Sequence, residues 1–106
     1  MAKGFILCAD DFAMTEGVSR AILDLLRQGK LTATGAMTNR PHWRRLAPEL
    51  AAFTGKADLG LHLNLTCAAP LSAMLRLAPG GLLPGLKDVA RAAATSGAAS
   101  SAARTD

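Results

Sequence analysis

The chain has 106 residues, half of them apolar, and a formal net charge of +4 at pH 7, which limits it to one domain with a modest core. Its basic residues are scattered and are not interleaved with aromatic side chains, so the charge does not indicate a nucleic-acid surface. No secretory leader and no apolar run approaching the ~20 residues of a membrane span is present, so we expect a cytoplasmic protein.

The first element is an apolar run, Phe5 to Ala9, followed by two adjacent carboxylates, Asp10 and Asp11. Such a run next to a helical pattern is typical of a buried parallel strand. The acidic pair would then lie at the carboxyl end of that strand, where α/β folds place their chemistry. Neighbouring negative charges repel each other, so the pair is a candidate metal site. The structural alternative is a polar turn that starts a helix.

A helix is predicted between Thr15 and Gly29. Thr15 suits the N-cap, Glu16 suits the positive end of the helix dipole, and Gly29 suits the C′ position. Its apolar residues repeat at helical spacing, namely Val18, Ala21, Ile22, Leu25 and Leu26. A second strand is predicted over 31–37, in which Gly35 indicates a close approach of another part of the backbone.

A second helix is predicted over 43–53, in which Pro48 predicts a kink or a late start. A buried third strand is predicted over 57–65. In that strand the leucines share one face, and the other face carries Gly60, His62 and Asn64. A long loop over 68–85 and a short helix over 86–94 follow. The tail 95–106 has the composition of a disordered segment.

Alternating strands and helices predict an α/β fold with parallel strands, either an open doubly wound sheet or part of a (β/α) barrel. Parallel neighbours bring their carboxyl ends to one edge, so Asp10, Asp11 and His62 are expected to converge. Carboxylate and imidazole groups together are a common ligand set for hydrolytic metals. A hydrogen-bonded structural role is the alternative for a lone histidine such as His62.

Three segments in order, 9–22, 31–39 and 60–66, resemble the YdjC/ChbG family of carbohydrate deacetylases. The loop 40–43 and the Pro-Gly-rich stretch are similar to the hopanoid-biosynthesis-associated members of that family. The resemblance covers about residues 4–94. It implies a distorted (β/α) barrel and metal-dependent removal of an N-acetyl group from an amino sugar. It also implies that Asp10 is the general base and that Asp11 and His62 are metal ligands, with Mg²⁺ or Zn²⁺ as the cofactor.

The sequence also departs from the family pattern. Ala13 stands where the family usually has glycine, and Ala68 lies in a similar glycine-favouring segment, so both are expected at turns that favour positive φ. The family's further ligand histidine, in a downstream motif, has no counterpart here. His42, in the loop after the second strand, is a candidate for substrate contact or a structural role, and its alternative role is the third metal ligand. Asn64 is a candidate for orienting His62 or contacting sugar hydroxyls.

Three strand–helix units cannot close an eight-stranded barrel. We therefore expect residues 1–94 to be the N-terminal part of one barrel and residues 95–106 to be a disordered tail. A truncated or frameshifted product, which would be non-catalytic and prone to self-association, is one alternative. A receiver-like signalling module that binds Mg²⁺ is another. It requires a phospho-accepting Asp at the end of the third strand, where this chain has His62 and Asn64.

Overall fold

A computed structural model describes residues 3–103 of the chain, with side chains up to residue 95. Contacts divide the chain into two compact units, the first ending at Asn64 and the second beginning at Leu65. The elements are β1 (Cys8–Phe12), α1 (Glu16–Arg27), β2 (Ala33–Ala36), α2 (Trp43–Ala51), β3 (Asp58–Leu61) and α3 (Leu86–Ala103). The first unit therefore holds the predicted strand–helix alternation, and the second holds one helix after a long loop.

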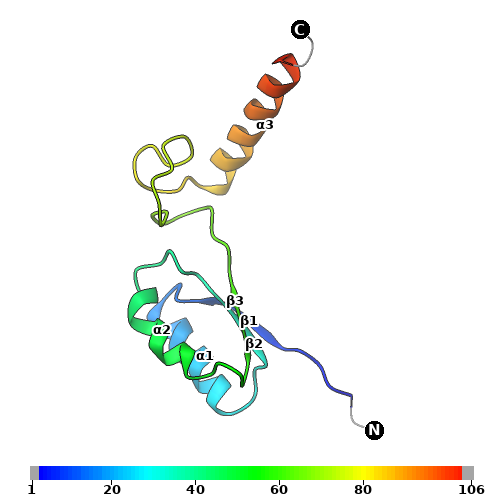
Figure 1. Cartoon of the computed structure of the whole chain (residues 1–106), viewed down its shortest axis with the longest axis vertical. Helices are drawn as coiled ribbons and strands as arrows, with labels where there is room; N and C mark the ends of the chain where they lie inside the picture. The colour runs from blue at the N-terminus through cyan, green and yellow to red at the C-terminus, as the bar shows by residue number, and fades with distance from the viewer. Residues whose placement is uncertain (1–2, 104–106) are drawn as a thin grey trace. The chain divides into compact units, whose positions relative to one another are not determined.

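The sheet has three parallel strands in the order β1-β2-β3. Helices α1 and α2 pack on the same face of this sheet (Figure 1). A doubly wound sheet reverses its strand order after the first crossovers and has helices on both faces, whereas a barrel adds each strand beside the last one. The observed order, with both helices on one face, matches the start of a (β/α) barrel, and the first three strands of a doubly wound sheet share it.

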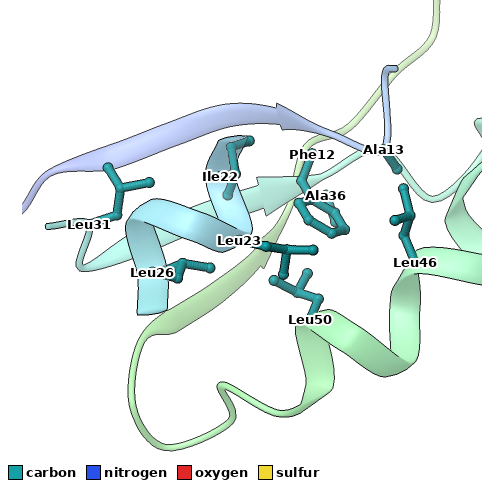
Figure 2. Packing of buried hydrophobic residues seen from close by; sticks show 9 residues of the cluster. All are labelled: Phe12, Ala13, Ile22, Leu23, Leu26, Leu31, Ala36, Leu46 and Leu50. Atoms are coloured by element: carbon teal, nitrogen blue, oxygen red, sulfur yellow. The ribbon is translucent and has the colours of Figure 1, made fainter. Parts of the chain in front are cut away.

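The hydrophobic core of the first unit lies between the two helices and the sheet. Figure 2 shows Leu23 of α1 and Leu50 of α2 pointing toward each other, beside Phe12 from the end of β1. Phe12, Leu23 and Leu46 are fully buried. The remaining buried members of the cluster are Ala13, Ile22, Leu26, Leu31, Ala36 and Leu50.

The buried face of α1 is rotated from the predicted one. Ser19 and Leu23 are buried, while Leu25 is exposed. The Ser19 hydroxyl accepts a hydrogen bond from the Ala13 backbone N–H at 2.9 Å and donates one to the Thr15 carbonyl at 2.7 Å. Burial of Ser19 is thus offset by two hydrogen bonds, which apolar periodicity does not register.

The predicted ends of α1 are confirmed. The Thr15 hydroxyl accepts a hydrogen bond from the Val18 N–H at 3.2 Å, as an N-cap does. At the other end Gly29 has a φ of 67°. The Gly29 N–H donates to the Leu26 carbonyl and the Lys30 N–H donates to the Leu25 carbonyl, which together form a Schellman motif.

Two strands predicted to be buried are largely exposed. β1 begins at Cys8, and the apolar residues before it are open to solvent, with Phe5 78% and Ile6 76% exposed. All four residues of β3 are exposed, and beyond it Leu63 is 67% exposed. The physical reason is that α1 and α2 cover one face of a three-stranded sheet, and no described element of this unit covers the other face or the β3 edge.

Helix boundaries also differ from those predicted. α2 begins at Trp43 and continues through Pro48, so the late start is wrong. α3 extends to Ala103, well past the predicted end at residue 94 and into the segment expected to be disordered. Alanine has the highest helix propensity, so an Ala-rich segment with little apolar bulk can still be helical. Residues 104–106 of the predicted tail lie outside the described residues. No helix in the described part of the chain is long and apolar enough to cross a membrane.

A network of charges joins the two helices. The Glu16 carboxylate at the start of α1 accepts hydrogen bonds from Arg20 and from Arg45 of α2, and Arg20 also donates to Glu49 of α2. The pKa of the Glu16 carboxyl is lowered from the ordinary 4.5 to about 2. The hydrogen bond from Arg45 is the largest cause, and the hydrogen bond from Arg20 adds to it. The ionised carboxylate is therefore favoured by the folded state.

Gly29→Ala should destabilise the fold by about 1 kcal/mol, because an L-residue in the left-handed region costs about 1–2 kcal/mol and only part is offset in the unfolded chain. No heavy atom lies within 4 Å of a Cβ added at Gly29, so the loss would be conformational. Gly17→Ala is the matched control. It makes the same change inside α1 at a site without positive φ, and it should stabilise by about 0.5–1 kcal/mol. Urea denaturation of both variants measures the difference.

Acid should weaken the first unit partly through Glu16. Because its pKa is depressed in the folded state, its stabilising contribution is present above about pH 4.5 and is lost as the pH falls toward about 2. Glu16→Gln should show a smaller loss of unfolding free energy over this interval than the natural chain, and so should Arg45→Gln. Equal acid dependence in all three proteins would contradict the assigned role of the network.

Candidate functional site

The acidic pair lies within an irregular part of β1 rather than after its end. The register between β1 and β2 runs from Ala9 with Thr34 to Phe12 with Ala36, and shifts between these pairs. Three steps along β1 therefore match two along β2, and Asp10 and Asp11 occupy the interval. Asp11 has a φ of 70°, in the left-handed region. A bulge of this kind re-aims side chains, and bulges are common beside active sites.

The turn after the bulge is held from two directions. Ala13 has a φ of 74°, which confirms the positive φ predicted where the family has glycine, and Ala68 in the second unit has a φ of 77°. The Ala13 N–H is bound by Ser19 of α1. From the loop after β2, the Arg40 guanidinium donates to the Met14 carbonyl at 3.2 Å. The loops that follow β1 and β2 are thereby joined.

His62 follows β3 directly and continues its pairing with β2. Its backbone N–H donates to the Ala36 carbonyl at 2.9 Å. A Cβ added at Gly35 would lie 3.3 Å from the His62 Cβ, which confirms the close approach predicted at that glycine. The carboxyl ends of the first and third strands are thus brought to the same edge of the sheet across β2.

Asp11 and His62 meet at this edge, as predicted. The Asp11 backbone N–H donates to the His62 Nδ1 at 3.2 Å. The Asp11 Oδ1 also lies 3.2 Å from the His62 Nδ1. The side chain of Asp11 is 40% exposed and that of His62 is 34% exposed. An Nδ1 that accepts from the amide has its one lone pair engaged in that hydrogen bond, so a metal ion would bind His62 through Nε2.

The other predicted site residues are placed separately. Asp10 is exposed, and no three His, Cys, Asp or Glu side chains gather closely enough to hold a metal ion in the part of the chain that the structure describes. The predicted convergence of three groups is therefore limited to Asp11 and His62. The Asn64 amide donates to the Asn39 Oδ1 at 3.2 Å. The His42 ring contacts Arg45 at 3.3 Å, on the network that joins the helices.

Three residues that the sequence analysis did not assign to the site support it. Asn39 anchors Asn64, Arg40 anchors the turn after the acidic pair, and Gly35 lies against His62. Asn39 and Gly35 fall within the segment 31–39 that resembles the family, and Arg40 follows it directly. Their position on the strand and loop next to the acidic pair is the sequence feature that could have identified them as site residues.

Asp11 and His62 fit one half of a metal site. Carboxylate oxygen and imidazole nitrogen both bind Zn²⁺ at about 2.0–2.2 Å. Because the His62 Nδ1 accepts the Asp11 N–H, Nε2 is the nitrogen of His62 that can bind a metal. Mg²⁺ prefers oxygen ligands and usually retains several waters, so a site with few protein ligands also suits it.

Comparisons with known proteins point to one family. The family described as YdjC-like protein matches residues 4–103. Carbohydrate deacetylase 2 of Listeria innocua is 39% identical over 67 residues, which cover 63% of this chain and 27% of that protein. Chitooligosaccharide deacetylase of Klebsiella pneumoniae is 35% identical over 83 residues, which cover 78% of this chain and 32% of that protein.

A solved structure shares the fold. It is an Enterococcus faecalis protein to which cellobiose-phosphate cleavage has been ascribed. The two structures superimpose with a TM-score of 0.65 and 24% sequence identity, and the match covers 77% of this chain and 34% of that one. The chain thus spans about a third or less of the length of these relatives.

The receiver-like alternative is not supported. Asp58 opens β3, whereas His62 follows its carboxyl end, so no aspartate of β3 stands beside the acidic pair. The match to one family covers nearly the whole chain, including all three strands and the bulge. This chain belongs to the YdjC-like protein family.

Proposed function

We propose that this chain carries part of the active site of a metal-dependent carbohydrate deacetylase, which removes an N-acetyl group from an amino sugar. The observation that carries the proposal is the contact between Asp11 and His62 at the carboxyl edge of the parallel sheet. The deacetylase names of the Listeria and Klebsiella relatives support the reaction class. The similarity of the loop 40–43 to the hopanoid-biosynthesis-associated members of the family suggests a substrate that belongs to hopanoid biosynthesis.

In this proposal Asp11 and His62 hold a divalent ion, Zn²⁺ or Mg²⁺, together with ligands from outside the described residues. When bound, such an ion polarises an amide carbonyl and lowers the pKa of a bound water. The bulge fixes the backbone position of Asp11, and the hydrogen bond from the His62 N–H to β2 fixes the backbone position of His62. Both side chains remain partly exposed, so a substrate can approach them.

Asp10 is the general base of the proposed reaction. It is exposed and adjacent to Asp11 in the bulge, and its role requires its carboxylate to turn toward the attacking water and accept a proton. The water oxygen bonds to the acetyl carbon and the C–N bond breaks. The proton held by Asp10 passes to the departing amine nitrogen, which yields acetate and a free amino sugar.

Asn64 and His42 are proposed to contact the substrate. Asn64 follows His62 at a spacing of two, and its bond to Asn39 holds the segment after β3 against the loop after β2. Its amide can then orient His62 or bind a sugar hydroxyl. His42 is the N-cap of α2, and its contact with Arg45 leaves it partly exposed. A contact with the outer part of a sugar chain is the role that suits this position.

Asp10→Asn should abolish acetate release from N-acetylglucosamine oligomers and leave Zn²⁺ binding nearly unchanged, because the amide cannot take a proton. A positioned general base typically contributes about 10²–10⁴-fold to the rate. Asp11→Asn is the matched variant at the neighbouring position. It should weaken Zn²⁺ binding as well as activity, because it removes a ligand charge. Released acetate and a Zn²⁺ titration by calorimetry measure the two effects.

Retained activity in Asp10→Asn would refute the role of Asp10, and tight Zn²⁺ binding by Asp11→Asn would refute that of Asp11. A natural chain that binds Zn²⁺ but releases no acetate would favour the non-catalytic alternative for this 106-residue product. Asp24→Asn, in an exposed ion pair with Arg27 on α1, is the control for loss of a surface carboxylate and should alter neither measurement.

Removal of the metal should abolish any acetate release. A chelator such as EDTA should stop the reaction, and added Zn²⁺ or Mg²⁺ should restore it, which also identifies the ion that supports it. Far-UV circular dichroism should remain unchanged on chelation, because the core of the first unit is formed by apolar packing that includes neither Asp11 nor His62. Activity that persists after exhaustive chelation would contradict metal dependence.

A further inference from the structure

Gly35 is the third residue of the central strand and is paired in register with Gly60 of β3. Neighbours in register present their side chains to the same face of a sheet, and His62 lies two residues after Gly60 on that face. A Cβ built at Gly35 would therefore point at His62. It would lie 3.3 Å from the His62 Cβ and 3.6 Å from its backbone nitrogen.

A glycine inside a strand is unfavourable by itself. It costs about 0.5–1 kcal/mol relative to alanine because it loses more backbone freedom on folding. Gly35 has no positive φ that would require glycine, since the positive-φ glycines in the described chain are Gly29, Gly55 and Gly81. The close approach of His62 is the steric reason that the structure offers for glycine at this position.

The hydrogen bond between the Asp11 N–H and His62 can lengthen only slightly before it is lost. The Asp11 N–H and the His62 Nδ1 are 3.2 Å apart, near the long end of ordinary N–H hydrogen bonds. A methyl group at position 35 would require His62 to give by a few tenths of an ångström. A movement of that size is enough to lengthen the hydrogen bond beyond its effective range.

We propose that Gly35 is a positioning residue for the site: its missing side chain lets His62 lie close against β2, and so lets the imidazole reach Asp11. The part of this inference that concerns metal and catalysis rests on the proposed function. The part that concerns the seating of His62 against Asp11 does not.

The test compares Gly35→Ala with Gly60→Ala. Both replace a strand glycine by alanine in register partners, but the nearest atom to an added Cβ at Gly60 is the Thr34 carbonyl oxygen at 4.0 Å. In metal-free ¹⁵N-labelled protein, the Asp11 amide proton reports its hydrogen bond to His62. Gly35→Ala should move this resonance toward its position in His62→Ala, and Gly60→Ala should leave it in place.

A Zn²⁺ titration gives the second measurement. Gly35→Ala should weaken Zn²⁺ affinity about tenfold, as displacement of the groups that orient a metal ligand typically does, and Gly60→Ala should not. An unchanged Asp11 amide resonance in Gly35→Ala, or equal changes in both variants, would overturn the proposal. If the natural chain binds neither Zn²⁺ nor Mg²⁺, the proposed function fails, while the amide resonance still decides the role of Gly35.

A further variant covers the case in which Gly35→Ala does not fold. The double variant Gly35→Ala/His62→Gly removes the Cβ that an alanine at position 35 would press against. It should recover the thermal midpoint of His62→Gly alone. A double variant that remains unfolded while His62→Gly folds would show that the added methyl group clashes elsewhere, and the proposal would be wrong.

Discussion

One peptide unit at the end of β2, between Ala36 and Met37, holds both sides of the candidate site. Its carbonyl accepts the backbone N–H of His62 at 2.9 Å, and its N–H donates to the carbonyl of Phe12 at 2.8 Å. The end of β1 and the continuation of β3 are therefore fixed to the same rigid plane. The distance between Asp11 and His62 follows from this double attachment more directly than from any contact of the side chains themselves.

The geometry on the β1 side is obtained at a conformational cost. Asp11 and Ala13 both have positive φ, which is unfavourable by about 1–2 kcal/mol for an L-residue. The compensating interactions lie on the core side. Ala13 is fully buried, and its N–H is bound by the Ser19 hydroxyl of α1. The rotated buried face of α1 is thus part of how the bulge is held, because it places Ser19 beneath the turn.

The sequence predicted the elements whose determinants are local. The Thr15 cap, the Gly29 end of α1, the parallel order of strands and the meeting of Asp11 with His62 all follow from short-range patterns and from the geometry of parallel sheets. It did not predict the bulge within β1 or the separate positions of Asp10 and His42. A register shift depends on how two strands fit together across the sheet, and apolar alternation in one strand carries no record of it.

The β3 segment shows why burial was predicted incorrectly there. Leu61 and Leu63 are 64% and 67% exposed, whereas the side chain of His62 between them is 34% exposed. Hydrophobic burial therefore does not determine where this segment lies. Its position is set by polar contacts with its neighbours: the His62 N–H with β2, the His62 ring with Asp11, and Asn64 with Asn39. A segment held in this way keeps its functional residues in register even where its apolar face has no described partner, so the geometry of the site does not depend on the exposed leucines.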